Sequence, residues 1–487
     1  MDAVDAMTTY ALQANTDYDA IDRIYVKNQL LALVGETPVT VADDAPILDV
    51  LDALVNGAVT HGVIGDSQRP RAELAADVMN LATPLPSTVT HTFWARYADS
   101  PEAALDYFYQ LSRANNYIQT RAIARNIEYR TPTEYGDLEI TINLSKPEKD
   151  PHDIAAAGKR QSHDYPQCAL CLENEGYEGS ATKAERANHR VVRMTVGGQP
   201  WGFQYSPYAY FSEHAIFLDD VHRPMHITAA TFTNLLDIVT TFPQYFVGSN
   251  ADLPIVGGSM LTHEHYQGGR HDFPMARAQV ETPITVPGFP DVVAGIVKWP
   301  MSVIRLTAAH TQRLAACAER VRAVWADYSD TSVSIQAHSK DGTPHHTVTP
   351  IARRVGDAYQ LDIVLRDNNT SVAYPDGIFH PHPDVQHIKR ENIGLIEVMG
   401  LAILPARLVG ELAEVRKFLL SQPSQVAPMH QAWAEQLKHA QTWQADTATA
   451  ELQQAVGRVF ARVLADAGVF KRDAAGRAAF NKFCSQL

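Results

Sequence analysis

Cysteine is scarce in this chain. Its 487 residues include four cysteines, at positions 168, 171, 317 and 484. Four thiols cannot form a disulfide scaffold for a chain of this length, so the small disulfide-rich secreted class is excluded. Chains that fold without such a scaffold are typical of reducing compartments. We therefore expect this protein to act in the cytoplasm.

Long apolar stretches are also missing. The longest runs, such as Leu30–Val34, are far shorter than the roughly 20 residues that cross a bilayer. The opening residues Met1–Asp5 have neither the basic region nor the apolar region of a secretory signal. From the sequence we expect neither membrane insertion nor secretion.

The chain has no excess of positive charge. Lysine and arginine together number 41 against 55 aspartates and glutamates, which gives a formal net charge of −14. An anionic surface disfavours non-specific binding of nucleic acid, so no nucleic-acid partner is expected. It also means that a phosphorylated substrate would need a local cationic pocket.

Three widespread catalytic motifs do not occur in the sequence: His-Glu-x-x-His, Gly-x-x-x-x-Gly-Lys-Ser/Thr and Gly-x-Ser-x-Gly. Their absence argues against zinc metalloproteases, P-loop nucleotide-binding proteins and α/β-hydrolases. The apolar fraction of 45% and the charged fraction of 20% are typical of a soluble globular enzyme and exclude a disordered chain.

The order of apolar residues predicts an α+β fold of two or more packed units. Residues 1–130 and 405–487 show helical spacing. A helix is also predicted over 308–325, and another after Thr228 with residues 232, 235, 236 and 239 on one face. Strand-like runs lie at residues 138–144, 191–196, 201–205, 215–218, 302–306, 348–355 and 359–365. A similar order of strands and helices before and after residue 292 suggests two related halves.

The most informative segment runs from Gly257 to His271 and contains His263-Glu264-His265-Tyr266-Gln267. If His263 to His265 is extended, the two imidazoles lie on one face about 7 Å apart, and Glu264 points to the other face. Neutral imidazole is a nucleophile at pH 7 and also the commonest zinc ligand among side chains. Gln267 would share the face of His265 and could donate an uncharged hydrogen bond.

Other residues of this segment suit an anionic substrate. Glycines at 257 and 258 let backbone amides approach an anionic oxygen, because no Cβ intervenes. Arg270 can pair with a phosphate through two hydrogen bonds. The alternative is a histidine-rich loop without function in a chain with 20 histidines. A nucleophile, a neutral donor, glycines and an arginine in one short segment favour the functional interpretation.

A second signal is Cys168-Ala169-Leu170-Cys171. Such a pair supplies half of the ligands of a tetrahedral zinc, and His222 and His263 could complete a Cys2His2 set. A second Cys-x-x-Cys is missing, which excludes a zinc ribbon. A thioredoxin-like redox pair is the competing interpretation, but the start of a helix that such a dithiol needs does not follow.

Together these segments resemble the galactose-1-phosphate uridylyltransferase family in its second, longer bacterial form. Four stretches carry the resemblance: residues 168–174, 201–208, 249–275 and 392–400. The family belongs to the histidine-triad superfamily and is built from two such halves. The resemblance implies two halves at residues 131–290 and 291–404, flanked by the helical regions 1–130 and 405–487.

The family implies a ping-pong uridylyl transfer from UDP-glucose to galactose 1-phosphate. His265 matches the nucleophile that would form a uridylyl-histidine, and Gln267 matches the glutamine that binds the phosphoryl oxygens. Gly258, Ser259 and Arg270 are expected to contact substrate. Glu397 matches a hexose-binding glutamate by position, although a glutamate that merely solvates a strand edge is an equal alternative at this position.

The zinc ligands carried over from the family are Cys168, Cys171, His222 and His263, with a structural role for the metal. The shorter form of the family reads His-Pro-His where this chain has Glu264 between the histidines. An asparagine expected eleven residues before His263 is replaced by Asp252, with Asn250 two positions away, which leaves the nucleotide contact there open.

Two rival functions stay open at this point. One is a histidine-triad hydrolase or phosphorylase of nucleotides, in which water or phosphate takes the nucleotidyl group. The other is a nucleotide-sugar-binding protein without catalysis, which would be expected to lack His265 or Gln267. The sequence does not determine the oligomeric state, and a homodimer is compatible with it.

Overall fold

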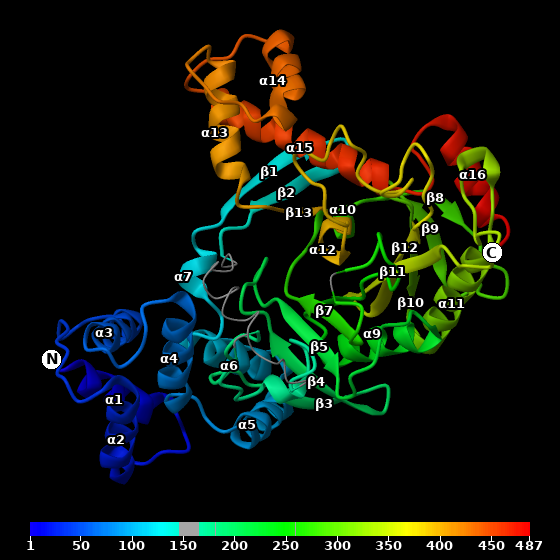
Figure 1. Cartoon of the computed structure of the whole chain (residues 1–487). Coiled ribbons are helices and arrows are strands. Elements are labelled where there is room, and N and C mark those ends of the chain that lie inside the picture. Colours follow the sequence, from blue (N-terminus) through cyan, green and yellow to red (C-terminus); the bar gives the residue numbers. More distant parts are fainter. Residues whose placement is uncertain (146–164, 181, 259) are drawn as a thin grey trace. The chain divides into compact units, whose positions relative to one another are not determined.

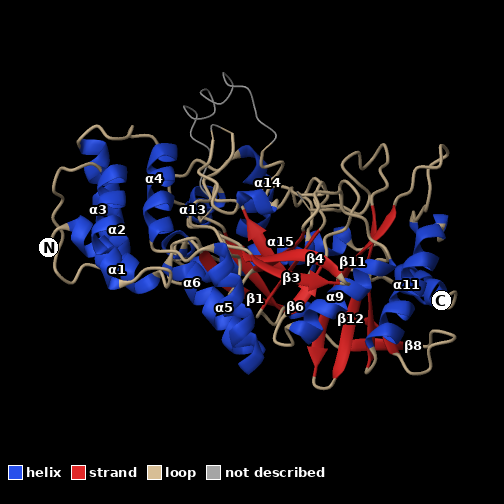
Figure 2. Cartoon of the chain, turned by 90° about the horizontal axis from the view of Figure 1, so that it is seen from below, coloured by secondary structure: helices blue, strands red, loops and turns tan. Residues whose placement is uncertain are grey.

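A computed structural model describes residues 1–145, 165–180, 182–258 and 260–487. The chain forms two compact units. The first comprises Met1–Ala124, Lys146–Ala209 and Glu213–Arg223, and the second comprises Arg125–Ser145, Tyr210–Ser212 and Pro224–Leu487. Both units contain helices and strands, which confirms the predicted α+β class (Figure 2).

Helices dominate the start of the first unit (Figure 1): α1 (Ala3–Ala14), α2 (Arg23–Val34), α3 (Ile47–Thr60), α4 (Gln68–Leu81), α5 (Pro86–Asp99), α6 (Pro101–Ala114) and the short α7 (Thr120–Ile123). The side chain of Asp2 accepts the first amides of α1 and so caps this helix. Helices α1 to α4 bury a common apolar core that includes Met7, Leu30 and Leu54. The helical start predicted from the sequence is confirmed up to Ile123.

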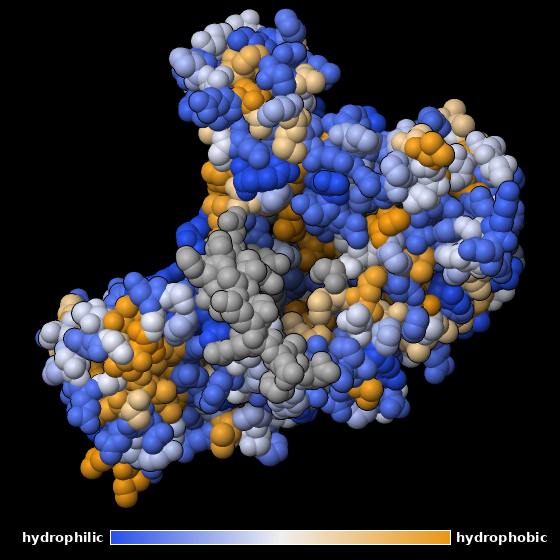
Figure 3. All heavy atoms as spheres, viewed as in Figure 1, coloured by the Kyte–Doolittle hydropathy of each residue, from blue (hydrophilic) through white to orange (hydrophobic). Residues whose placement is uncertain are grey.

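The N-terminal helices also expose apolar residues. Figure 3 shows apolar side chains gathered over this part of the molecule. Ile21, just before α2, and Ile24 and Tyr25, in its first turn, are among the exposed large hydrophobic residues. Helix α2 therefore buries one apolar face, with Val26 and Leu30, and leaves a second apolar strip in water.

Three strands complete the first unit: β3 (Val192–Val196), β4 (Gln199–Tyr205) and β5 (Ala215–Asp219). They form an antiparallel meander, with β4 between the other two. Phe93 of α5 and Phe108 of α6 make edge-to-face contacts with Phe203 of β4, which attaches these helices to the sheet. The predicted strands at 191–196, 201–205 and 215–218 are confirmed.

A larger sheet organises the second unit. Its strands lie in the order β7 (His265–Gly269), β6 (Phe246–Gly248), β11 (His346–Val355), β12 (Ala358–Asp367), β10 (Val303–Ala308), β9 (Val293–Val297) and β8 (Val280–Ile284). Helices α9 (Ala229–Thr241) and α11 (Thr311–Asp327) pack on this sheet and on each other (Figure 1). The predicted stripe of α9 is confirmed, because its four residues are buried.

A second, three-stranded sheet lies in the same unit. The hairpin of β1 (Ile127–Thr133) and β2 (Gly136–Ile142) is antiparallel, and β13 (Leu401–Leu404) adds parallel to β2. Apolar and polar residues alternate over 138–144, which predicts a half-buried strand; this prediction is wrong, since Leu138 to Ile142 are all buried. The reason is that β2 is the central strand and packs against both α10 (Pro274–Arg277) and α15 (Ala448–Ala467).

The chain ends in helices, as predicted. They are α13 (Leu408–Leu419), α14 (Pro428–Ala440), α15 and α16 (Ala474–Cys484), preceded by the short α12 (Leu395–Val398). Val415, Leu419, Ala434 and Leu452 form a small core among α13, α14 and α15. Among the described residues, no helix combines the length and the apolar character needed to cross a membrane.

Candidate functional site

His265 is the first residue of β7 and is 5% exposed. Its Nδ1 lies 2.8 Å from the backbone carbonyl oxygen of His263. Because a carbonyl oxygen can only accept, Nδ1 carries the proton and donates it in this hydrogen bond. Nε2 is then the ring nitrogen with a lone pair. The backbone thus selects the tautomer that a nucleophilic histidine needs.

The protonation state of His265 follows from its surroundings. Burial lowers the pKa of this imidazole to about 4, although the hydrogen bond to His263 acts in the opposite direction. The ring is consequently neutral at pH 7, and its lone pair is available for bond formation.

The expected continuous strand from His263 to His265 is wrong in one respect. His263 lies in a bend, and β7 begins only at His265. The bend brings the carbonyl of His263 back to the ring of His265, which a fully extended segment would not do. Both histidines are buried, as is Glu264 between them.

Gln267 lies in the middle of β7, opposite Gly248 of β6. Side chains two positions apart in a strand point to the same face, so Gln267 and His265 share one side of β7. The strand that this prediction requires is present from His265 to Gly269. The side chain of Gln267 is half-buried.

The glycine segment before the histidines packs against Asn250. A Cβ built on Gly258 would lie 2.5 Å from Nδ2 of Asn250, so only glycine fits without a shift. Oδ1 of Asn250 accepts the backbone amide of Leu395 at 2.9 Å. Ser259, the other predicted contact in this segment, lies outside the described residues.

Glu397 reaches the same place from α12. A Cβ on Gly394 would lie 3.3 Å from both Oδ1 of Asn250 and Oε2 of Glu397, so the two side chains lie around one glycine. Nζ of Lys389 donates to Oε1 of Glu397 at 3.0 Å. Burial by itself would lower the pKa of Lys389, but Glu397 and Glu391 raise it overall. Glu397 is therefore paired in a buried cluster rather than free at a strand edge.

Arg270 follows the end of β7. Five residues of extended chain separate it from His265, or about 16 Å between Cα atoms at about 3.3 Å per residue. Arg270 lines a cavity of about 270 Å³ together with His271, Arg353 and Arg354. The cavity is rich in cationic side chains, which suits a phosphate, but His265 is not among its lining residues.

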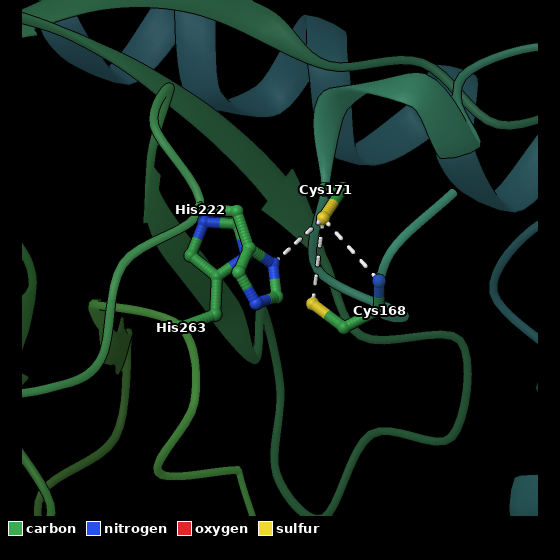
Figure 4. A group of neighbouring side chains, drawn as sticks. All are labelled: Cys168, Cys171, His222 and His263. Atoms are coloured by element: carbon green, nitrogen blue, oxygen red, sulfur yellow. Dashed lines mark hydrogen bonds between the residues drawn. The ribbon is translucent and has the colours of Figure 1, made fainter. Parts of the chain in front are cut away.

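The four predicted zinc ligands come together. Figure 4 shows the side chains of Cys168, Cys171, His222 and His263 turned toward one another. One ligand atom from each lies within 4.8 Å of all the others. Sγ of Cys171 is 3.5 Å from Sγ of Cys168 and 3.2 Å from Nδ1 of His222. The two cysteines are not joined in a disulfide.

This donor set fits a metal ion. Two sulfurs and two imidazole nitrogens match structural zinc, and burial raises the pKa of the Cys171 thiol. A buried thiol with a raised pKa stays protonated unless a cation stabilises the thiolate. The group therefore has the composition and the spacing of a metal site.

Asp252, at the position where an asparagine was expected, binds the protein itself. One carboxylate oxygen accepts the amide of Ile227 at 2.9 Å, and the other accepts the hydroxyl of Thr347. The nucleotide contact considered for Asp252 and Asn250 stays a prediction.

Lys389 and the bonds of Glu264 and Asp252 were not foreseen from the sequence. Lys389 is buried and bridges Glu397 and the carbonyl of Ile403. No periodic pattern could have identified it, because a lysine in an irregular segment is ordinarily exposed. For Glu264, the sequence did offer a signal: it lies between two functional histidines. A charged residue buried at such a position requires a hydrogen-bond partner.

Comparison with known proteins defines the class. The N-terminal domain model of galactose-1-phosphate uridyl transferase matches residues 16–224, and the C-terminal domain model matches residues 238–435. These two matches cover most of the chain. The chain thus belongs to the galactose-1-phosphate uridylyltransferase family and is a nucleotidyltransferase of galactose metabolism.

Curated relatives agree over the full length. A galactose-1-phosphate uridylyltransferase of Lacticaseibacillus paracasei is 61% identical over 98% of both chains. That of Lactiplantibacillus plantarum is 58% identical over 100% of both chains. Galactose-1-phosphate uridylyltransferase 2 of Streptococcus pneumoniae is 54% identical over 100% of this chain and 99% of its own.

Among solved structures, yeast Ap4A phosphorylase is similar at 11% identity, covering 63% of this chain and 91% of its own, with a TM-score of 0.31. A likeness this distant supports no inference about function.

Proposed function

We propose that this chain moves a uridylyl group from UDP-glucose to galactose 1-phosphate in two displacements at His265. In the first, Nε2 of His265 attacks the α-phosphorus and forms an N–P bond. The bond from the α-phosphorus to the bridging oxygen breaks, and glucose 1-phosphate leaves. In the second, a phosphate oxygen of galactose 1-phosphate attacks the same phosphorus, breaks the N–P bond and forms UDP-galactose.

The observation that carries this proposal is the hydrogen bond from Nδ1 of His265 to the carbonyl of His263. It leaves Nε2 unprotonated in a buried, neutral ring, which is the state in which an imidazole attacks phosphorus. As the bond forms, the positive charge that develops on the ring is stabilised at Nδ1–H by this carbonyl. Full-length similarity to curated galactose-1-phosphate uridylyltransferases supports the substrates.

Gln267 and the glycine segment are proposed to bind the reacting phosphate. Gln267 shares the face of His265 and can donate an uncharged hydrogen bond to a phosphoryl oxygen. Gly258 and Ser259 would offer backbone amides to the same phosphate, and the close packing of Gly258 on Asn250 supports this role.

Arg270 and Glu397 are proposed to contact the sugar phosphates. Arg270 would contact a phosphate oxygen from its cationic cavity, and Glu397 would accept hydroxyl groups of the hexose. The position of Glu397 beside Asn250 supports its part in this site. Lys389 holds the carboxylate of Glu397 and limits its freedom to turn.

We propose further that Cys168, Cys171, His222 and His263 hold a structural zinc ion. With four protein ligands the metal would have no open position, so when bound it supplies stability rather than chemistry on the substrate. His263 would then be fixed by its ring, while its carbonyl orients His265.

The two related halves also remain a proposal. Along the chain, three antiparallel strands, a helix and two antiparallel strands occur first as β3 to β7 with α9, and again as β8 to β12 with α11. This repeated order supports two histidine-triad-like halves, which we propose at 131–290 and 291–404 between helical regions at 1–130 and 405–487; β8, the first strand of the second repeat, lies before residue 291. Four cysteines without a disulfide bond among them support the expected cytoplasmic location.

The test uses UDP-glucose labelled in the uridine. Incubation without galactose 1-phosphate should give a labelled, acid-labile protein and one equivalent of glucose 1-phosphate. Galactose 1-phosphate should then remove the label as UDP-galactose. Label released by water as UMP would instead indicate a hydrolase, and label released by inorganic phosphate as UDP would indicate a phosphorylase. No label on the protein would contradict the covalent route.

A further inference from the structure

Three consecutive backbone amides, Met225 to Ile227, donate to the chain around His265. We call residues 225–227 the strap. The first amide donates to the carbonyl of Leu261 at 2.9 Å. The second donates to Oε2 of Glu264 at 3.1 Å, and the third donates to the carboxylate of Asp252 at 2.9 Å. Two of the three acceptors are carboxylates, whose hydrogen bonds are stronger than those of neutral acceptors.

Glu264 connects the strap to the residue on the other side of the nucleophile. Its carboxylate is buried and also accepts the hydroxyl of Tyr266. The oxygen of that hydroxyl accepts Nδ2 of Asn234, a residue of α9, at 3.2 Å. Both sequence neighbours of His265 are therefore tied to the opposite side of the strand, one to the strap and one to a helix.

Asp252 connects the strap to the sheet. One of its oxygens binds the strap, and the other accepts the hydroxyl of Thr347 in β11. Both oxygens of this carboxylate thus accept donors from the protein. Asp252 is therefore better suited to anchor the strap than to bind an incoming nucleotide.

We propose that Glu264 and Asp252 are positioning residues that aim His265 by fastening the strap to the histidine segment. The proposal rests on the proposed role of His265 as nucleophile. The tautomer and direction of the His265 ring depend on the carbonyl of His263, and that carbonyl belongs to the peptide unit that links His263 to Glu264. When Glu264 is held by the strap and by Tyr266, the carbonyl has one orientation. When it is released, the ring loses its fixed partner.

This arrangement explains why the buried carboxylate of Glu264 and the part-buried carboxylate of Asp252 can lie beside the proposed phosphate site. A buried carboxylate is costly unless donors satisfy it, and an anion near a phosphate repels it. Here the charges are engaged by backbone amides and hydroxyls of the protein. The benefit of these carboxylates is that they keep the nucleophile near its attack position. A displacement of about 1 Å would slow the reaction by about 10²-fold.

The test compares Glu264→Ala with Glu264→Gln in the full chain. Glutamine keeps an oxygen that accepts the amide of His226, whereas alanine removes it. We expect Glu264→Ala to speed hydrogen exchange of the strap amides and to slow formation of the uridylyl-protein by about 10²-fold at saturating UDP-glucose, with KM little changed. Glu264→Gln should restore both within about fivefold. Glu414→Ala, which removes a carboxylate that accepts the Gln425 amide in the C-terminal helices, should change neither.

Three further variants keep the test decisive. Tyr266→Phe removes one donor to Glu264 without emptying the core, and it should slow the same step less than Glu264→Ala. Asp252→Asn retains an acceptor for Ile227 and should act like wild type, whereas Asp252→Ala should free the strap.

Unchanged exchange and rate in Glu264→Ala would overturn the proposal. So would a slowed reaction with protected strap amides, or an equal loss in Glu264→Gln. If wild-type protein forms no uridylyl-protein, the proposed function fails, and the exchange data alone decide whether the carboxylates hold the strap.

Discussion

The chain contains two His-x-His pairs, and their surroundings differ. In His263-Glu264-His265, the second histidine starts a strand, and its Nδ1 bonds the carbonyl of His263. In His380-Pro381-His382, the second histidine lies in a loop after β12. Nε2 of His382 is 3.1 Å from the carbonyl of Ile378, and Nδ1 is 3.5 Å from the carboxylate of Asp466.

The difference shows that the His-x-His motif alone does not make a histidine nucleophilic. Both ring nitrogens of His382 face acceptors, and the ring stacks on Tyr374 with a centroid separation of 4.1 Å. Such a histidine fastens a loop to α15 through Asp466. His265, with one nitrogen committed and the other carrying a lone pair, is suited to react. The partners of each ring, rather than the spacing of the histidines, separate catalysis from structure.

The largest effect should come from His265→Asn. The variant loses the ring nitrogen that forms the covalent bond, so we expect uridylyl transfer to fall by at least about 10⁴-fold while UDP-glucose still binds. Rapid-quench measurement of labelled protein checks this. His382→Asn is the matched control and should keep the rate within about tenfold, or about 1.4 kcal/mol in barrier. Comparable losses in both variants would break the distinction between the two pairs.

Cys168→Ser tests whether a metal ion holds His263. Among the described residues, His380 of the second pair belongs to no such group of metal ligands. We expect bound zinc and the midpoint of thermal unfolding to fall together, with activity lost in proportion to the misfolded fraction. Elemental analysis and calorimetry measure both. Cys317→Ser, at a buried thiol outside the ligand group, is the control. Fully active wild-type protein with far less than one zinc per chain would contradict the metal assignment.

Gln267→Ala should slow the first half-reaction by about 2–4 kcal/mol in barrier, because a phosphoryl oxygen loses its donor. The residue two positions beyond His382 is Asp384, whose side chain is exposed. Asp384→Ala should leave transfer unchanged. Separate assays of the two half-reactions make the comparison, and a normal first half-reaction in Gln267→Ala would remove its assigned role.

The smallest effect is expected for Arg270→Ala. Loss of a charged hydrogen bond of about 1.5–3 kcal/mol should raise KM for sugar phosphate by about tenfold to a hundredfold and change kcat little. Steady-state kinetics with galactose 1-phosphate checks this, with Arg458→Ala on the surface of α15 as the control. A fall in kcat alone would place Arg270 at the reacting phosphorus instead of in its cationic cavity.

Much of the architecture was predictable from local pattern. The apolar stripe of α9, the strands of the first meander and the helical ends follow from periods of 3.6 and 2 residues, which local geometry imposes. The burial of β2 was not predictable, because covering its second face depends on α15, more than 300 residues away in the sequence. The spacing of apolar residues shows which face of a helix or strand is apolar, but not which distant element packs against that face.

The sequence by itself determined the chemistry available in this protein: a histidine pair with a glutamine two residues on, a cysteine pair, and no competing catalytic motif. Only the tertiary structure decided which nitrogen of His265 is free, how Glu264 and Asp252 are satisfied, and that Glu397 is paired with Lys389. The physical reason is the same in each case. A hydrogen-bond donor or acceptor is read from the residue type, but its partner depends on residues brought near by folding, and the partner sets the tautomer, the pKa and the direction of the group.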